Sequence, residues 1–387
     1  MTPPAFEHAK NHRQRVRAAG LSPDYWYPVE WDRNVKPGQV IDATFWNQSI
    51  AVFRGKNGAL HAIENRCAHR QLKLSLGQVG DCTLTCAYHG WMYDGAGRCT
   101  QMDHDLFGHT FPRLKIASYP LQVKHGLIWV FPGDPSLAEV RRVPEIPELE
   151  GAHPWGSIAV DFSWRAHHSM IIDNVSDFTH AYLHRKSKPF TDAKLTMMEP
   201  QADRVLLAYD TKVGQGKISG LFVDRKKTNT NAMTLAYEYP YQWSNTDDKI
   251  KHWCFVLPID GQTTRVFFIF YFSHDMLKVP FIPLRIPRPL VRAIMAASKR
   301  LLVKPLLEED GFAVEAEQEA WARHFDQPIA ELNPVVHQFQ QLTIRKWEEH
   351  LARSRAENAE GSRAEHGEHI TFKDLAQSAP RMRAGNP

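Results

Sequence analysis

The first third of the chain alternates short apolar runs with turn signals. The runs Ser49 to Arg54 and Leu60 to Glu64 enclose Asn57-Gly58, a dipeptide typical of tight hairpin turns. Leu127 to Phe131 supplies a further buried strand before Pro132-Gly133. This spacing predicts a small all-β domain over residues 25–135.

Longer apolar and aromatic runs follow in the middle of the chain and predict an antiparallel sheet. These runs are Val205 to Tyr209, Met233 to Tyr241, His252 to Leu257 and Arg265 to Phe272. Helical patterns precede and follow them, so we expect an α+β fold in which the all-β domain leads into a second domain over residues 152–352. The proline-spaced acidic segment Val143 to Gly151 favours extended backbone and predicts a linker over residues 136–151.

Both ends of the chain are polar. Residues 1–24 are rich in Arg and predict an N-terminal surface helix, while Trp321 to Leu351 is expected to be helical. Residues 353–387 contain few apolar side chains and predict a disordered tail. The histidines near the two ends are expected on the surface: His8, His12, His366 and His369.

Composition narrows the class of protein. Of the 387 residues, 43% are hydrophobic, and 47 basic against 43 acidic residues give a net charge of +4, which indicates no nucleic-acid footprint. No apolar stretch has the length of a transmembrane segment, and Val279 to Ala297 is interrupted by proline and arginine. Five cysteines suit reduced thiols better than a disulfide framework, which favours a cytoplasmic protein.

The first candidate metal site combines two Cys-x-His motifs. Cys67-Ala68-His69 is followed after sixteen residues by Cys86-Ala87-Tyr88-His89-Gly90-Trp91. In a [2Fe–2S] cluster, two thiolates can hold one iron and two imidazoles the other. The same four groups can also bind one structural zinc ion. Zinc motifs usually pair Cys with Cys and His with His, so one of each in both arms favours the cluster.

These motifs resemble the Rieske family. Respiratory Rieske proteins carry an additional cysteine in each loop, and here those positions hold Leu72 and Tyr88. Tyr88, Gly90 and Trp91 fit the oxygenase branch, so the chain is similar to Rieske non-haem iron oxygenases from about Tyr25 to about Gln318. The resemblance implies that Cys67, His69, Cys86 and His89 bind the cluster.

A second constellation lies in Asn174-Val175-Ser176-Asp177-Phe178-Thr179-His180-Ala181-Tyr182-Leu183-His184. On a helix, His180 and His184 would share one face, with Asn174 and Asp177 on the same broad side. A polar cluster of this kind is costly to bury unless it is paired or binds a metal. Three residues separate the two histidines here, whereas many members of the family have four.

The third iron ligand is expected later in the chain. In the family it is a carboxylate on a helix, followed five residues later by Glu, and Asp310 with Glu315 matches that pattern. Glu309 is the competitor, because adjacent carboxylates are hard to rank by spacing alone. With His180 and His184, such a carboxylate would complete a facial triad for Fe(II). The acidic run would otherwise be a solvated first turn of a helix.

The resemblance implies a terminal oxygenase component. Electrons from NAD(P)H would arrive through a separate reductase or ferredoxin and pass from the [2Fe–2S] cluster to the mononuclear Fe(II). There they would serve to oxidise an apolar, aromatic or natural-product-like small molecule with O₂, as a monooxygenase or a dioxygenase. The reaction would be a hydroxylation, a demethylation or an oxidative cyclisation. The resemblance further implies a homotrimer in which Asp177 orients His180 and reaches His89 of a neighbouring subunit. The alternative is a Rieske electron-transfer or binding protein without oxygenase activity.

Overall fold

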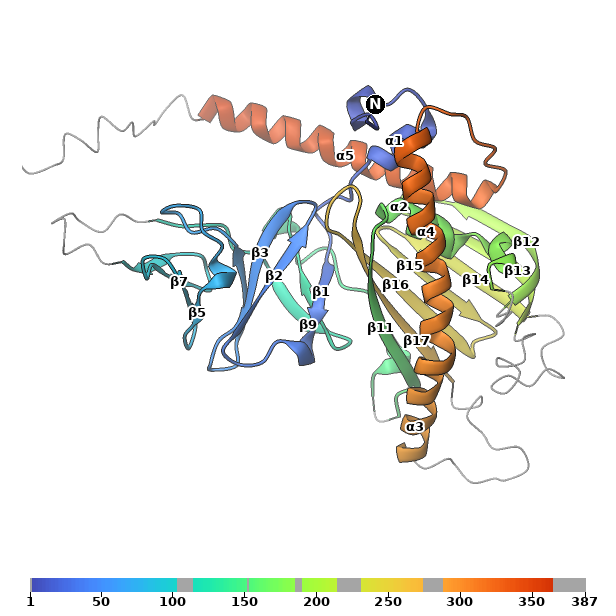
Figure 1. Cartoon of the computed structure of the whole chain (residues 1–387), viewed down its shortest axis with the longest axis horizontal. Coiled ribbons are helices and arrows are strands. Elements are labelled where there is room, and N and C mark those ends of the chain that lie inside the picture. Colours follow the sequence, from blue (N-terminus) through green and yellow to red (C-terminus); the bar gives the residue numbers. More distant parts are fainter. Residues whose placement is uncertain are drawn as a thin grey trace, which may run out of the picture.

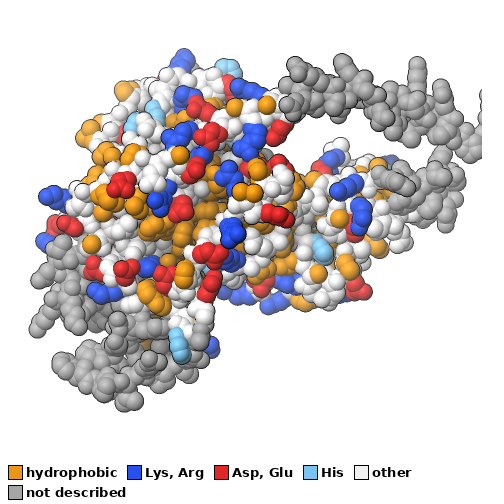
Figure 2. Space-filling view, turned by 180° about the vertical axis from the view of Figure 1, so that it is seen from behind, with side chains coloured by type: hydrophobic (Ala, Val, Ile, Leu, Met, Phe, Trp, Pro, Cys, Tyr) orange, Lys and Arg blue, Asp and Glu red, His pale blue; other side chains and the backbone are white. Residues whose placement is uncertain are grey.

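The computed structural model describes residues 2–102, 114–151, 153–184, 190–213, 231–273 and 288–364. A β-rich N-terminal part lies beside a larger part in which helices cover one face of a wide sheet (Figure 1). The predicted α+β fold is therefore confirmed. On the face seen in Figure 2, basic and acidic side chains are interspersed.

The N-terminal part contains three small antiparallel sheets. Their strand orders are β1-β10-β9, β2-β3-β4 and β5-β6-β7-β8. The predicted hairpin is present as β3 paired with β4, and Gly58 in its turn has φ +92°. The strands are β1 (Tyr27–Trp31), β2 (Gln39–Phe45), β3 (Gln48–Arg54), β4 (Leu60–Glu64), β5 (Gln78–Val79), β6 (Thr83–Thr85), β7 (Met92–Asp94), β8 (Cys99–Gln101), β9 (Leu121–Lys124) and β10 (Leu127–Val130).

One seven-stranded antiparallel sheet forms the second part. Its order is β11-β17-β16-β15-β14-β13-β12. The strands from β12 to β17 each pair with the next strand in the sequence, whereas β11 pairs with β17, the last strand. The strands are β11 (Gly156–Trp164), β12 (Phe190–Pro200), β13 (Arg204–Val213), β14 (Asn231–Glu238), β15 (Tyr241–Thr246), β16 (Ile250–Pro258) and β17 (Thr264–Phe272). The inner strands β16 and β17 bury long apolar runs, as a sheet covered by helices requires.

Helices from both ends of the chain cover this sheet (Figure 1). The α-helices are α1 (His12–Ala18), α2 (His168–Ser176), α3 (Arg288–Ser298), α4 (Lys304–His324) and α5 (Pro334–Ala364). A π-helical turn, Lys299–Val303, joins α3 to α4, and the 3-10 helices are Phe6–His8, Asp32–Asn34, Leu74–Leu76, Pro135–Leu137, Pro147–Leu149 and Phe178–Tyr182. None of the described helices is long and apolar enough to cross a membrane.

Polar contacts join the two parts. Arg265 on β17 forms an ion pair with Glu30 on β1 at 2.9 Å, and Asp161 on the neighbouring strand β11 holds the same guanidinium at 2.8 Å. The β2–β3 turn donates two backbone hydrogen bonds to the end of β16, from Trp46 to the carbonyl of Pro258 and from Asn47 to that of Ile259. The N-terminal part is therefore docked on the sheet rather than loosely tethered to it.

Three predictions about the chain ends need correction. The N-terminal helix is not a surface helix: Val16 and Arg17 are buried, and the ring of His12 lies 4.5 Å from that of His337. The helix expected from Trp321 to Leu351 is divided into α4 and α5 at residues 325–333, where Pro328 and Pro334 interrupt helical hydrogen bonding. The expected tail begins later, because α5 continues to Ala364 through Ala, Glu and Arg, which favour helix.

The histidines near the chain ends and the predicted linker were also assigned from the sequence. His8 is exposed, as expected. His366 and His369 lie outside the described residues, as does the tail from residue 365 onward. The predicted linker contains two short 3-10 helices, and its residues Val143 and Ile146 are buried in the main apolar core.

Candidate functional site

The two predicted cluster loops meet at the end of the N-terminal part. The ring centroids of His69 and His89 are 4.5 Å apart and both side chains are exposed, whereas Cys67 and Cys86 are buried. The indole of Trp91 stacks on His69 at 4.7 Å. Two thiols thus lie inside the domain and two imidazoles lie at its surface.

Short-range hydrogen bonds shape these loops. The backbone N–H of Cys67 donates to the carbonyl of Leu72, and that of Cys86 donates to the carbonyl of Trp91. The Tyr93 hydroxyl accepts from the N–H of Ala68 at 3.0 Å and lies 3.3 Å from the Cys67 Sγ. Each cysteine therefore sits in a closed turn with its sulfur directed inward.

The thiols are in an apolar setting that suits metal binding. Burial raises the pKa of the Cys86 thiol, and the neighbouring Cys67 thiol adds to the shift. A coordinating metal ion is the usual means by which such thiols become thiolates, because its charge replaces the lost hydration. The two buried sulfurs with two exposed imidazoles fit a [2Fe–2S] cluster held by Cys67, His69, Cys86 and His89.

The second site brings together residues 126 positions apart in sequence. The Oδ1 atom of Asp310 on α4 lies 3.5 Å from the Nε2 of His180 and 3.3 Å from the Nε2 of His184. One possible ligand atom from each of the three residues lies within 4.8 Å of the others. Two imidazoles and one carboxylate that approach a common position from one side match the facial triad that binds Fe(II).

The other nitrogen of each ring is already engaged. The Nδ1 of His180 contacts the backbone carbonyl of Asp177, and the Nδ1 of His184 lies 2.9 Å from the Oε2 of Glu309. These contacts leave both Nε2 atoms directed toward Asp310. Glu309 therefore orients a histidine, while Asp310 occupies the position of a third ligand.

The Asp310 carboxylate shows why this group of side chains suits a cation. Its Oδ1 atom is buried and has no hydrogen-bond partner among the described residues. A buried carboxylate oxygen without a partner is costly, and a bound metal ion removes that cost. Burial tends to lower the pKa of His184, but the carboxylates of Asp310 and Glu309 outweigh burial and raise it.

The local structure around the histidines differs from the expected single helix. Helix α2 ends at Ser176, and Phe178–Tyr182 forms a separate 3-10 helix that carries His180, with His184 just beyond it. Asp177 lies between them with φ −93° and ψ 95°, so it ends one helix and caps the next. The two imidazoles converge through this break and not through the i, i+4 stacking of an α-helix.

Asp177 and Asn174 lie beside the site. The Asp177 Oδ1 accepts hydrogen bonds from the Thr179 N–H at 2.8 Å and from the Asn333 Nδ2 at 2.8 Å. Within this chain it contacts His180 through its backbone carbonyl, not through the predicted carboxylate. Asn174, Asp177 and His180 also line a hollow of about 550 Å³ whose other walls come from α1, α4, α5 and residues 327–331.

Two residues that hold α4 in place have contacts that sequence reasoning did not foresee. The Oε1 of Glu315 accepts from the backbone N–H of Arg165, and the Oε1 of Gln318 accepts from that of His167, both at 2.9 Å. Glu315 was singled out only by its distance from Asp310 in the sequence. Gln318 had no local signal, because its partner is 151 residues away.

Comparison with known proteins agrees with this geometry. Residues 25–112 match the model of the Rieske [2Fe–2S] domain, and residues 164–354 match the vanillate O-demethylase oxygenase C-terminal domain. A 4β-methylsterol monooxygenase of Methylococcus capsulatus is 45% identical over 87% of this chain and 91% of its own length. The vanillate O-demethylase oxygenase subunit of a Pseudomonas species is 34% identical over 36% of this chain and 42% of its own length.

Solved structures share the fold. The crystal structure of dicamba monooxygenase bound to 3,6-dichlorosalicylic acid superimposes with a TM-score of 0.69 over 87% of this chain and all of its own, at 18% identity. The Rieske prediction is thus confirmed over the zinc alternative, and oxygenase relatives argue against a simple electron carrier. Proteins of this class work with a separate reductase or ferredoxin. The chain belongs to the Rieske non-haem iron oxygenases, as a terminal oxygenase component with a [2Fe–2S] cluster and a mononuclear iron site.

Proposed function

We propose that this protein is a monooxygenase that hydroxylates a methyl group on a sterol-like polycyclic lipid. The observation that carries the proposal is the 45% identity to a 4β-methylsterol monooxygenase across nearly the whole of both chains. Apolar rings beside the metal ligands support a lipid substrate. The ring of Phe190 lies 5.4 Å from that of His180, and the ring of Phe178 lies 4.8 Å from that of Phe190.

The proposal assigns a ligand set to each metal. Cys67, His69, Cys86 and His89 hold the cluster, and His180, His184 and Asp310 hold the iron, which when bound supplies the means of activating O₂ with electrons from the cluster. Glu309 keeps the His184 ring oriented by accepting from its Nδ1, and the Asp177 carbonyl does the same for His180. His184 and Asp310 are buried, whereas His180 lines the hollow described above.

The proposal includes a cyclic homotrimer. The strands β5 and β7 lie at the opposite end of the molecule from α2 (Figure 1), which favours electron transfer between subunits over transfer within one chain. Exposed apolar side chains occur near both metal sites, namely Leu76 and Tyr88 near the cluster, and Tyr182 and Leu332 near Asp177. Two different patches of this kind suit a head-to-tail contact that closes into a ring.

The proposal also places the protein in the cytoplasm. All five cysteines are free, and Cys82 is exposed. Free thiols of this kind suit a reducing compartment.

The substrate is tested with the purified protein, a reductase and NADH. A 4,4-dimethylsterol is compared with an aromatic methyl ether such as vanillate, because the C-terminal domain model favours O-demethylation as a second candidate. We expect the sterol to gain one hydroxyl oxygen from ¹⁸O₂, detected by mass spectrometry. Turnover of vanillate with no oxidation of the sterol would overturn the sterol proposal.

The contact between subunits is tested with Asp177→Asn. We expect this variant to keep its trimeric mass and both metals, to accept electrons at the cluster, and to fail to pass them to the iron in single-turnover experiments. The reason is that the Asp177 carboxylate would bind His89 of the partner subunit, while the backbone carbonyl of Asp177 contacts His180 and is kept in the variant. A monomeric active wild type, or normal oxidation of the substrate by the variant, contradicts the proposed ring.

A further inference from the structure

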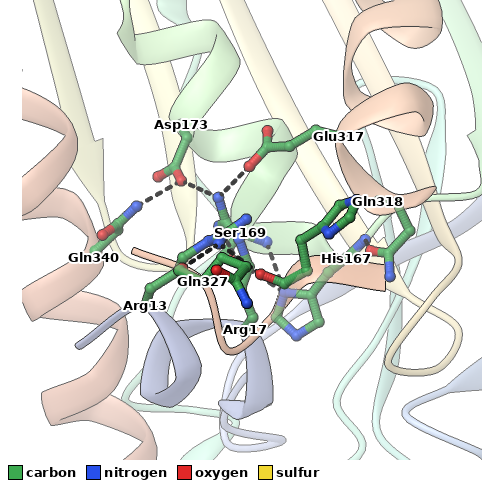
Figure 3. A network of polar contacts seen from close by, with 10 residues as sticks. Arg13, Arg17, His167, Ser169, Asp173, Glu317, Gln318, Gln327 and Gln340 are labelled. Atoms are coloured by element: carbon green, nitrogen blue, oxygen red, sulfur yellow. Dashed lines mark hydrogen bonds and ion pairs between the residues drawn. The ribbon is translucent and has the colours of Figure 1, made fainter. Parts of the chain in front are cut away.

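The N-terminal helix inserts one arginine between α4, which carries Asp310, and α2, which directly precedes the segment with His180 and His184. Arg17 on α1 is buried, and Figure 3 shows its guanidinium between α2 and α4. It donates to the Ser169 Oγ at 2.6 Å and to the Asp173 Oδ2 at 2.8 Å, both on α2. It also donates to the Glu317 Oε1 on α4 at 2.8 Å.

The two acidic partners, Asp173 and Glu317, are close in sequence to the proposed iron ligands. The carbonyl of Asp173 accepts the N–H of Asp177 at 3.0 Å, so Asp173 belongs to the last turn of α2 before the His180 segment. Glu317 follows Asp310 by seven residues, which is about two turns, and therefore lies on the same side of α4. Arg17 thus connects the two helices on the side that faces the metal site.

The charges make this connection stronger than a single hydrogen bond. Asp173 is 8% exposed, and its Oδ2 also accepts from the Nε2 of Gln340 on α5 at 2.7 Å. Burial would lower the pKa of Arg17, but the carboxylates of Asp173 and Glu317 raise it, so the guanidinium stays charged. Without it, the buried carboxylate of Asp173 and the partly exposed carboxylate of Glu317 would face each other with no positive charge between them.

We propose that Arg17 is a positioning residue for the mononuclear iron: by bridging Asp173 and Glu317 it sets the separation of α2 and α4, and so the distance between the histidine pair and Asp310. This inference rests on the proposed iron ligands. Glu315 and Gln318 fix α4 to the β11–α2 connection, and Arg17 adds a tether at the other end of α2. The N-terminal helix is then part of the iron site without contacting the metal.

The test measures retention of iron by the whole protein. The mononuclear Fe(II) of Arg17→Met is expected to pass to a competing chelator roughly tenfold faster than that of the wild type, as for other residues that orient metal ligands. The visible absorption of the cluster should be unchanged. Arg15→Met is the matched control, because Arg15 lies on the same helix and pairs with Glu348 on α5, away from α2 and α4.

A triple variant separates positioning from general stability. Arg17→Met combined with Asp173→Asn and Glu317→Gln removes the two carboxylates that lose their partner, of which Asp173 is the buried one, and should regain much of the lost thermal stability while iron is still released fast. If the triple variant regains both stability and iron retention, or if Arg17→Met retains iron as well as Arg15→Met does, the positioning role is wrong. His184→Ala serves in the same assay: if it also keeps its iron, the proposed ligand set fails and not the role of Arg17.

Discussion

The cluster site and the iron site differ in how far apart their ligands lie in the sequence. The four cluster ligands fall within 23 residues, on two turns that close through hydrogen bonds between near neighbours such as Cys86 and Trp91. The iron site joins His180 and His184 to Asp310, and its geometry depends on α1, α2 and α4. A local motif is therefore enough to bring the cluster ligands together, whereas the iron ligands meet only through packing between distant parts of the chain.

The largest expected effect is loss of the cluster. Cys86→Ser should abolish the visible absorption of the [2Fe–2S] centre, because no other described thiol can replace the missing ligand. The mononuclear site should still bind one Fe(II), since its ligands come from separate elements. Cys82→Ser is the control, because Cys82 is exposed, and bleaching of that variant would contradict the ligand assignment.

The next prediction ranks the two adjacent carboxylates at the iron site. Asp310→Ala should remove the mononuclear iron, whereas Glu309→Gln should weaken Fe(II) binding by roughly 10- to 100-fold, because Glu309 acts through His184. Iron content and chelator competition measure both variants, with the cluster absorption as an internal reference. The reverse order would make Glu309 the ligand.

Steric change next to Asp310 should lower the stability of the fold and loosen the iron site. A Cβ atom at Gly311 would lie 2.4 Å from the Nε1 of Trp164, a buried side chain that has little room to move. Gly311→Ala should therefore cost about 1–3 kcal/mol in unfolding free energy and loosen iron binding. Gly261→Ala meets no atom within 4 Å and should change neither property.

The smallest expected effect at neutral pH comes from a buried histidine of the second domain, His168, because its contribution to stability changes only in acid. Burial lowers the pKa of His168 to about 3, and its Nε2 donates to the carbonyl of Ala19. The unfolded chain binds a proton below about pH 6.5 while the folded chain does not, so stability falls as the pH drops from 6.5 toward 3.

By pH 4.5 this group contributes a loss of about 2–3 kcal/mol. His168→Gln should remove that portion of the acid sensitivity, measured as the difference in unfolding free energy between pH 7 and pH 4.5. Burial also holds the pKa of His167 well below its usual range. The variant should therefore keep part of the dependence of unfolding free energy on pH. An unchanged pH dependence would mean that His168 is protonated in the folded protein.

The sequence by itself determined the class of this protein and predicted candidate ligands for both metals. The paired Cys and His motifs identify the cluster loops because backbone turns of a few residues place their side chains, and strands such as β3 and β4 follow from local alternation and the Asn57-Gly58 turn. The ranking of Asp310 above Glu309 could not be read from spacing. It depends on which carboxylate of α4 faces the histidines, and that rotation is set by tertiary contacts.

Only the tertiary structure decided the role of the N-terminal helix and the break before His180. Arg17 carries no local signal, since its partners lie 152 to 300 residues away and its burial depends on three helices meeting. The sequence around Asp177 is compatible with one continuous helix, but α2 ends where side chains of Asp177 and Asn333 form a cap that joins it to the start of α5. Local propensities are worth a few tenths of a kcal/mol per residue, so such distant contacts override them.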